Sequence, residues 1–256
     1  MLLTIDIGNT NITLGLYEGR ERKHAWRLET VRGRMPDEYG LQMLGLFERA
    51  DCQADQIDGC VLASVLPPLT GTLVSACQSY IGQVPLVVDA GVKTGLSIRY
   101  EDPKNALGAD RVADAVAVQH LYRIPACVVD FGTATTFDAI SSEGEYLGGA
   151  IAPGLDIAAD ALFHRAAKLP RVELARPTAA IGRNTVEAVQ SGMIFGYVGL
   201  VEGMVKRFKD ELGQNTKVIG TGDLVGLIAA ETTVIEILAP WLTLDGLQII
   251  WSLNQD

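Results

Sequence analysis

The chain has 256 residues, of which 48% are hydrophobic and 20% charged, and its formal net charge is −10. This length supports one large domain or two modest ones with buried cores, and the composition excludes a disordered, collagen-like or disulfide-stapled chain. The acidic excess argues against duplex nucleic acid as a partner, because such binding draws on Lys and Arg to neutralise phosphates. It does not exclude a phosphorylated small molecule, which backbone N–H groups and a metal ion can hold.

The N-terminus and the cysteines indicate the compartment. The four cysteines are widely spaced, with no C-x-x-C pair, whereas zinc sites need closely spaced ligands. We therefore expect buried thiols in a reducing environment. The chain starts with a short apolar stretch followed by Asp6, unlike a signal peptide, and no uninterrupted apolar run approaches the ~18–20 residues that cross a bilayer. The sequence predicts a cytoplasmic protein with no membrane partner.

The first elements along the chain are predicted to be strands. Residues 2–16 alternate β-forming residues around a Gly-Asn-Thr-Asn insert, and residues 24–31 form another extended run. The turn at residues 17–20 joins them as a hairpin. A helix is predicted over residues 37–50, where apolar residues recur every three or four positions. Short strands are then expected at residues 60–65, 86–89 and 217–220.

The second half of the chain repeats the order of the first. A strand ends at Asp130, a second extended run follows, and a turn around Gly144 leads into a third. Asp6 and Asp130 are 124 residues apart, and the hairpin glycines Gly19 and Gly144 are 125 apart. Strand–glycine–turn units also recur by chance in α/β proteins, but the shared order of aspartate, glycine, hydroxyl residues and hairpin favours a duplication.

Helices are also predicted at residues 110–122 and 185–209, the second containing Gly192, Gly196, Gly199 and Gly203. Glycine in a helix interior costs about 1 kcal/mol relative to alanine, so these four indicate close approach to another backbone, within the core or across a dimer. Because strands and helices alternate, we expect an α/β fold with two sheets, each backed by helices.

Two glycine-containing turns are the first candidate sites. In Asp6–Asn11, glycine lets the backbone approach a phosphate, and the carboxylate could hold magnesium directly or through water. A tight hairpin uses the same residue types. The turn Asp130–Thr136 again combines a strand-end carboxylate with glycine and hydroxyls. Facing each other across a cleft, the two could clamp one polyphosphate. This arrangement resembles the actin, sugar-kinase and Hsp70 superfamily, in which duplicated domains hold ATP between them. No G-x-x-x-x-G-K-[ST] sequence is present, which argues against a P-loop.

Three further segments admit both a functional and a structural interpretation. In Gly108–Arg111 the carboxylate could accept a hydroxyl proton and the guanidinium could fix a polar substrate. The same segment also fits a helix N-terminus, with aspartate favoured by the dipole and Arg111 facing solvent. Ile181–Thr185 fits a helix cap formed by Asn184 or Thr185. Gly220–Asp223 could pass close to a nucleoside, or be an ordinary α/β connection.

Taken together, these segments resemble the type III pantothenate kinase family, and the resemblance extends over essentially the whole chain, to residues 242–247. The motifs that carry it are Asp6-x-Gly8-Asn9-Thr10, Gly108-Ala109-Asp110-Arg111, Asp130-Phe131-Gly132-Thr133-Ala134-Thr135, Gly148-Gly149-Ala150-Ile151-x-Pro153-Gly154 and Ile181-Gly182-x-Asn184-Thr185.

The resemblance implies duplicated ribonuclease-H-like, actin-like ATPase domains with two mixed sheets flanked by helices and the active site in the cleft between them. The domains would be residues 1–122 and residues 123–256, the second including a dimerisation helix. The implied reaction transfers the γ-phosphate of ATP to the primary hydroxyl of pantothenate, giving 4′-phosphopantothenate, the first step of coenzyme A synthesis. The implied cofactors are ATP with Mg²⁺ and a monovalent cation, K⁺ or NH₄⁺, and the implied assembly is a homodimer.

The resemblance also implies roles for individual residues. Asp110 would be the catalytic base, and Asp130 would bind the monovalent cation. Magnesium would lie near Asp6. The residues expected to bind ATP are Asp6, Ile7, Gly8, Asn9, Thr10, Asn11, Ile12, Thr13 and Thr133. Those expected to bind pantothenate are Tyr100, Gly108, Ala109, Asp110, Arg111 and Thr185, the last in the site of the other subunit.

One position departs from the family pattern, and two rival functions stay open. The family continues Gly220–Gly222 with another glycine, where this chain has Asp223, so no nucleoside contacts are assigned. One rival is a kinase of the same superfamily acting on a sugar or a carboxylate. The other is a nucleotide-dependent switch without transferase activity, against which the presence of Asp6, Asp110 and Asp130 counts.

Overall fold

The computed structural model describes residues 1–101, 107–166 and 169–255, which form two compact units. Unit 1 comprises Met1–Leu96, Tyr100–Tyr122 and Trp241–Asp256, and unit 2 comprises Ser97–Arg99 and Arg123–Pro240. The main boundary between the two units along the chain therefore lies between Tyr122 and Arg123. The segment from Trp241 onward lies with unit 1, whereas the sequence placed it in the C-terminal domain. The reason is that its apolar helix packs on the sheet of unit 1.

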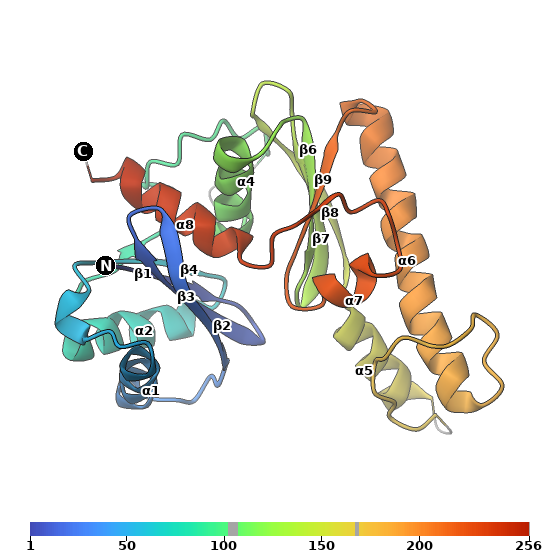
Figure 1. Cartoon of the computed structure of the whole chain (residues 1–256), viewed down its shortest axis with the longest axis horizontal. Coiled ribbons are helices and arrows are strands. Elements are labelled where there is room, and N and C mark those ends of the chain that lie inside the picture. The colour runs from blue at the N-terminus through green and yellow to red at the C-terminus, as the bar shows by residue number, and fades with distance from the viewer. Residues whose placement is uncertain (102–106, 167–168, 256) are drawn as a thin grey trace. The chain divides into compact units, whose positions relative to one another are not determined.

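The sheet of unit 1 has the order β3-β2-β1-β4-β5 among the described residues (Figure 1). Strand β1 pairs antiparallel with β2 and parallel with β4, and a hairpin joins β2 to β3. The bounds are β1 Leu2–Ile7, β2 Asn11–Glu18, β3 Glu21–Glu29, β4 Gly59–Ser64 and β5 Leu86–Val87.

The sheet of unit 2 repeats this topology over the part of the chain that the structure describes. Its order is β10-β9-β6-β7-β8, in which β6 pairs antiparallel with β7 and parallel with β9. The hairpin glycines Gly19 and Gly144 both have positive φ, 60° and 81°, which glycine adopts without strain. The predicted pair of mixed sheets is confirmed. The bounds are β6 Ala126–Phe131, β7 Ala134–Ile140, β8 Tyr146–Pro153, β9 Lys217–Thr221 and β10 Ile237–Leu238.

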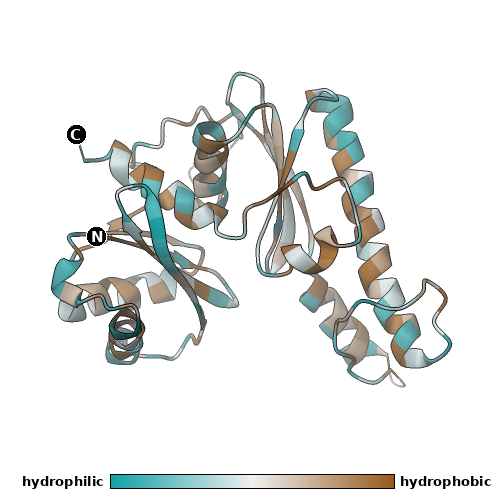
Figure 2. Cartoon of the chain, viewed as in Figure 1, coloured by the Kyte–Doolittle hydropathy of each residue, from teal (hydrophilic) through white to brown (hydrophobic). Residues whose placement is uncertain are grey.

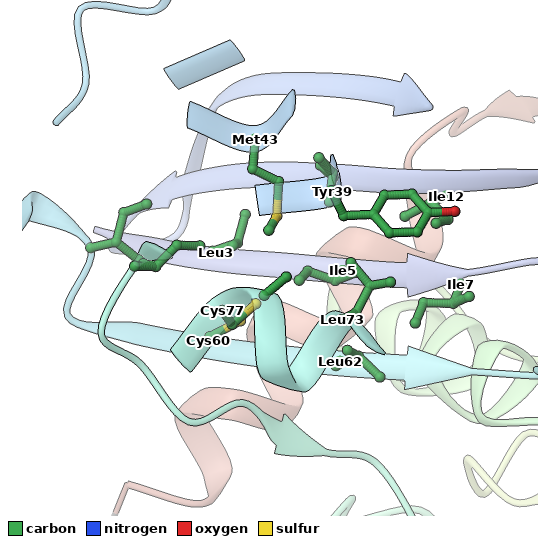
Figure 3. Close-up of a cluster of buried hydrophobic side chains, with 14 of the residues drawn as sticks. Leu3, Ile5, Ile7, Ile12, Tyr39, Met43, Cys60, Leu62, Leu73 and Cys77 are labelled. Carbon is green, nitrogen blue, oxygen red and sulfur yellow. The ribbon is translucent and has the colours of Figure 1, made fainter. Parts of the chain in front are cut away.

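One face of the unit 1 sheet packs against helices α1 (Pro36–Arg49) and α2 (Pro67–Tyr80). Alternate residues of β1 point into this core, as period-two strands require, and Figure 3 shows Leu3, Ile5 and Ile7 there beside Met43 and Leu73. The expectation of buried thiols is confirmed: all four cysteines are free and buried. The sequence did not predict α2 or the short 3₁₀ helix Ala54–Gln56.

The opposite face of the unit 1 sheet packs against helices α4 (Ala109–Leu121) and α8 (Leu242–Leu253). Two strand glycines make room for α8. A Cβ atom on Gly15 would lie 3.0 Å from Leu244 Cδ1, and one on Gly59 would collide with the ring of Trp251. Helix α8 can therefore lie close to the sheet because these strand positions have no side chain.

The core of unit 2 lies between its sheet and helices α5 (Leu155–Arg165), α6 (Thr185–Leu212) and α7 (Val225–Ala229). Figure 2 shows the long helix α6 with brown apolar residues among teal polar ones. Within the described residues, α6 is the single helix long and apolar enough to cross a membrane. Its apolar residues Ile194, Val201 and Val205 lie in the unit 2 core, and this position accounts for its composition.

The expected close approach to the α6 glycines does not occur among the described residues. A Cβ atom added at Gly192, Gly196 or Gly199 would meet nothing within 4 Å, and all three positions are exposed. At Gly203 the nearest atom, 3.6 Å away, belongs to Arg207 of the same helix. Packing inside the core is thus the wrong explanation for these glycines.

Candidate active site

The first predicted turn lies at the carboxyl end of β1 and is closed by its own backbone. The N–H of Gly8 donates to the carbonyl oxygen of Asn11 at 3.0 Å. Thr30, just after β3, donates its N–H to the carbonyl of Thr10 at 2.9 Å and its hydroxyl to the carbonyl of Gly8 at 2.8 Å. A Cβ atom on Gly8 would lie only 2.9 Å from the Asn11 oxygen, so this compact turn requires glycine.

The eight residues of this turn expected to bind ATP divide into three groups. The side chains of Ile7 and Ile12 are fully buried in the unit 1 core, so these two residues offer only backbone groups to a ligand. Asp6 pairs with Thr13 in register, and both are half-buried on the opposite face of the sheet. The tip of the turn is open: Asn9 and Thr10 are exposed, and Gly8 and Asn11 are half-buried.

The second predicted segment, Gly108–Arg111, reaches the same edge of the unit 1 sheet. Strand β4 runs parallel to β1, and the N–H of Val65 at its end donates to the carbonyl of Ile7 at 3.1 Å. A Cβ atom on Gly108 would lie 3.6 Å from Val65 Cγ1. The carboxyl ends of neighbouring parallel strands therefore bring the Asp6 turn and the start of α4 to one edge, where α/β folds commonly bind ligands.

Asp110 lies in the first turn of α4, where the helix dipole favours a carboxylate. Its Oδ1 accepts the N–H of Arg111 at 2.8 Å and lies so close to Gly108 that any side chain there would collide with it. The side chain of Arg111 is only 7% exposed, so the alternative expectation that it faces solvent is wrong. This segment thus combines an N-terminal carboxylate with a buried guanidinium.

The equivalent turn of unit 2 lies between β6 and β7 and is held by more distant segments. Gly132 donates its N–H to the carbonyl of Ala134 at 3.1 Å, and Gly154 donates to the carbonyl of Thr133 at 3.2 Å. A Cβ atom on Gly154 would lie 2.6 Å from the Gly132 oxygen. At Gly222, with φ of 90°, a Cβ atom would collide with the carboxylate of Asp130. Three predicted motifs therefore meet at this turn.

A buried tyrosine braces the turn from behind. The Tyr197 hydroxyl, on α6, lies 2.6 Å from both Thr135 Oγ1 and the carbonyl oxygen of Pro153. A phenol has one proton, so it donates to the carbonyl and accepts from the threonine hydroxyl. Burial raises the pKa of Tyr197 above its ordinary value, which keeps this proton in place. These hydrogen bonds tie α6, β7 and β8 together, and no sequence pattern singles out Tyr197.

Thr185 is the first residue of α6. Asn184 is the cap, since its side chain accepts the N–H of Glu187 at 3.0 Å, and the Glu187 carboxylate accepts the N–H of Arg183 at 2.8 Å. Of the two cap candidates, Asn184 therefore has this role, and Thr185 is exposed. It lines a cavity of about 540 Å³ together with Leu162, Leu169, Gly182, Arg183, Asn184, Ala188, Val189, Gly192 and Met193.

Tyr100 is the remaining predicted substrate residue. It is half-buried and belongs to unit 1, like Asp110. The structure therefore brings the Asp6 turn and Gly108–Arg111 together in unit 1, and Asp130, Thr133, Gly154 and Gly222 together in unit 2. The contacts of Gly154 and Gly222 with the turn were missed, although both glycines stand in segments that the sequence singled out.

Comparison with known proteins identifies related chains of one family. The family model for type III pantothenate kinase matches residues 2–207. A type III pantothenate kinase of Moorella thermoacetica is 53% identical over 99% of this chain and 100% of its own length. One of Geobacillus sp. (strain WCH70) is 50% identical over 100% of this chain and 99% of its own length.

Solved structures support the fold. A conserved Campylobacter jejuni protein assigned to the Baf family of transcriptional activators superposes with a TM-score of 0.62 at 21% identity, covering 98% of each chain. The inorganic polyphosphate/ATP-glucomannokinase of Arthrobacter sp. strain KM superposes with a TM-score of 0.51 at 14% identity, covering 99% of each chain. The fold is thus that of the actin-like sugar kinases and ATPases, and with its motifs, its duplicated sheets and its close relatives the chain belongs to the type III pantothenate kinase family.

Proposed function

We propose that this chain transfers the γ-phosphoryl group of ATP to the primary hydroxyl of pantothenate, giving 4′-phosphopantothenate and ADP. The observation that carries the proposal is a duplicated pair of strand-end turns, each with an aspartate, a glycine and hydroxyl residues, in a chain of this family. Phosphoryl transfer is accelerated mainly by positioning and charge neutralisation. A site built from backbone turns and a few carboxylates suits that demand.

Asp110 is the base in this proposal. Its carboxylate orients the primary hydroxyl of pantothenate and accepts its proton as the bond to phosphorus forms. Gly108 and Ala109 bring the backbone beside the substrate. Arg111, fixed by burial, holds a polar group of pantothenate, and Tyr100 lines the same pocket.

The two turns hold ATP. The open tip from Gly8 to Asn11, with Asp6 and Thr13 beside it, contacts the phosphates, and Ile7 and Ile12 contribute backbone groups. Thr133 contacts ATP from the turn of unit 2. Asp6 holds magnesium, directly or through water, since this hard cation prefers oxygen ligands. A net charge of −10 is compatible with a polyphosphate ligand because backbone amides and cations do the neutralising.

Asp130 binds the monovalent cation. The residues around it are compatible with such an ion: the carboxylate is half-buried, Gly222 packs against it without a side chain, and a Cβ atom on Gly132 would lie within 4 Å of both this carboxylate and the carbonyl oxygen of Ala134. In the part of the chain that the structure describes, no three His, Cys, Asp or Glu side chains gather as a metal site. A carboxylate and backbone carbonyls supply the oxygen ligands that a hard cation prefers. When bound, K⁺ or NH₄⁺ adds positive charge near the phosphates.

The active form in this proposal is a homodimer. The exposed glycine face of α6, at Gly192, Gly196 and Gly199, offers a smooth surface to a second copy, and the cavity beside Thr185 is open. Thr185 then reaches pantothenate in the site of the other subunit. A mixture of Asp110→Asn and Thr185→Val chains tests this, because each mixed dimer contains one intact site. We expect the mixture to recover kinase activity. A mixture that stays as inactive as the two separate variants would contradict the shared site.

The main test is ADP release by the purified chain in the presence of ATP and magnesium, with pantothenate, glucose, glycerol or acetate as acceptor. Release with pantothenate alone supports the proposal. Release with a sugar or acetate instead identifies another kinase of the superfamily, and nucleotide binding without any release identifies a switch. We assign the reaction to the cytoplasm, where four buried unbridged thiols are stable.

A further inference from the structure

The C-terminal helix α8 lies beyond residues 2–207, which the family model matches, and has no assigned role. It packs against α4, the helix that begins with Ala109–Arg111 (Figure 1). The contact is backbone to backbone at Gly246, where any side chain would collide with the carbonyl group of Ala113. The two helices are therefore so close at this point that not even a methyl group fits between their backbones.

A hydrogen bond ties the same two helices one residue further along α4. The hydroxyl of Thr243 donates to Oδ1 of Asp114 at 2.8 Å. Asp114 is only 2% exposed, and a buried carboxylate depends strongly on each donor that it has. It follows Asp110 by four residues, so the two carboxylates lie on the same face of α4 in successive turns.

Helix α8 is itself anchored to the β2–β3 hairpin. The hydroxyl of Tyr17 donates a hydrogen bond to Asp245 at 2.6 Å, and Asp245 forms an ion pair with Arg22. Gln248 donates to the carbonyl of Gly19 at 3.1 Å. This hairpin includes β2, which begins at the Asp6 turn. Helix α8 therefore connects the sheet that carries one candidate turn to the helix that carries Asp110.

We propose that Thr243 and Gly246 are positioning residues for the catalytic turn of α4. Their contacts fix the position of the first two turns of α4 along and around its axis relative to α8. This in turn positions the Asp110 carboxylate and the Arg111 guanidinium. This inference rests on the proposed role of Asp110. Side chains at a reacting centre must be held to about 0.5 Å, and a misplacement of about 1 Å can cost a hundredfold in rate.

The first variant is Thr243→Val, which keeps the shape of the side chain but removes the hydroxyl that donates to Asp114. We expect kcat to fall by about 10- to 100-fold while KM for ATP stays near the wild-type value. Thr243→Ser restores the hydroxyl and should recover most of kcat. The matched control is Ser252→Ala on the same helix, whose hydroxyl bonds only within α8 according to the described contacts and should leave kcat unchanged.

Gly246→Ala supplies a second, independent change at the backbone contact. We expect it to lower kcat at least as much, whereas Gly45→Ala, on a helix face with nothing within 4 Å, should not. Thermal unfolding of each variant is measured so that kcat is compared per folded molecule. If Gly246→Ala does not fold, Thr243→Val and Thr243→Ser still decide the question.

Hydrogen exchange gives a readout that needs no turnover. In Thr243→Val, amides of residues 109–114 should exchange faster than in the wild type, while those of α1 stay unchanged. A wild-type kcat in Thr243→Val, a loss that Thr243→Ser fails to recover, or unchanged exchange in α4 would overturn the inference. Failure of the proposed function looks different: the wild type releases no ADP with pantothenate, yet the exchange measurement still reports the coupling.

Discussion

Units 1 and 2 share one strand topology but differ in how their helices are arranged. In unit 1, α1 and α2 pack on one face of the sheet and α4 and α8 on the other. In unit 2, α5, α6 and α7 join a single core with the sheet. Helix α8 follows β10 in the chain but packs in unit 1. The two sheets therefore share the same order of strands, whereas the helices that pack on them are arranged differently.

The two strand-end turns differ in a related way. The turn of unit 1 is closed locally, by Asn11 and Thr30, and leaves its tip exposed. The turn of unit 2 is packed against glycines from two remote segments, Gly154 and Gly222. Sheets conserve the position of a strand end because the ladder fixes it, whereas the loop beyond it can be held by different partners. Substitutions should therefore affect the two units in different ways.

The largest effect is expected from Asp110→Asn in unit 1. Turnover should fall by about 10²- to 10⁴-fold, the range that general acid–base groups contribute, because an amide cannot accept the hydroxyl proton. ATP binding and thermal stability should stay near wild type. Asp37→Asn is the matched control, since Asp37 also stands in the first turn of a helix, α1, on the other face of the sheet. Near-normal turnover in Asp110→Asn would remove Asp110 from the mechanism.

The next effect separates the two strand-end aspartates by the cation that each is proposed to bind. Asp130→Asn should raise the K⁺ concentration for half-maximal activity by roughly 10- to 100-fold, as expected for loss of a charged ligand worth about 1.5–3 kcal/mol. Asp6→Asn should instead raise the requirement for Mg²⁺. Titration of activity with each ion in turn distinguishes them. Full activity of the wild type with sodium as the only monovalent cation would contradict the Asp130 assignment.

A smaller effect on stability is expected when a glycine that contacts each turn is replaced by alanine. Gly154→Ala places Cβ against the carbonyls of both Thr133 and Gly132, and should cost about 1–3 kcal/mol of stability and raise KM for ATP. Gly8→Ala meets a single carbonyl at 2.9 Å and should cost less. Denaturant unfolding and ATP kinetics of both variants measure the difference. Equal stability of the two would show that remote packing does not hold the unit 2 turn.

The smallest effect concerns alkaline stability in unit 1. Burial, and then the nearby Asp245 carboxylate, raise the pKa of Tyr17 well above its ordinary value of about 10. Below pH 10 both folded and unfolded chains keep this proton; above it only the unfolded chain releases it. The folded state should therefore lose about 1.4 kcal/mol per pH unit above pH 10 from this group alone. Tyr17→Phe should show a shallower fall in unfolding free energy between pH 10 and 11, and an unchanged slope would contradict the assignment.

Much of the fold was predictable from the sequence, and the reasons are local. Period-two alternation and hairpin glycines such as Gly19 and Gly144 identified the strands, and a three-to-four-residue spacing predicted α1 at residues 37–50, against Pro36–Arg49 in the structure. Helix α2 was missed because it begins with two prolines and has no charged residue to mark its outer face. Helix α8 is apolar on most sides, so its pattern did not reveal which sheet it covers.

The candidate site was predictable as motifs but not as an arrangement. Asp6, Gly108 and Asp110 were identified individually, and only strand pairing brings their segments to one edge. The convergence of Gly154 and Gly222 on one turn depends on contacts with residues 130–133, about 20 and about 90 positions away in the sequence, which periodicity does not record. The buried position of Arg111 likewise follows from tertiary packing around α4.

The return of α8 to unit 1 has a consequence for synthesis on the ribosome. Residues 123–240 form unit 2 almost continuously, so its segments are all available before the last helix is made. Unit 1 needs both ends of the chain: until residues 241–253 have left the exit tunnel, Gly15, Gly59 and the apolar side of α4 lack the helix that covers them. Unit 1 is therefore completed only after unit 2 has been synthesised, and nascent chains stalled near Pro240 should depend on chaperones more than chains that already include α8.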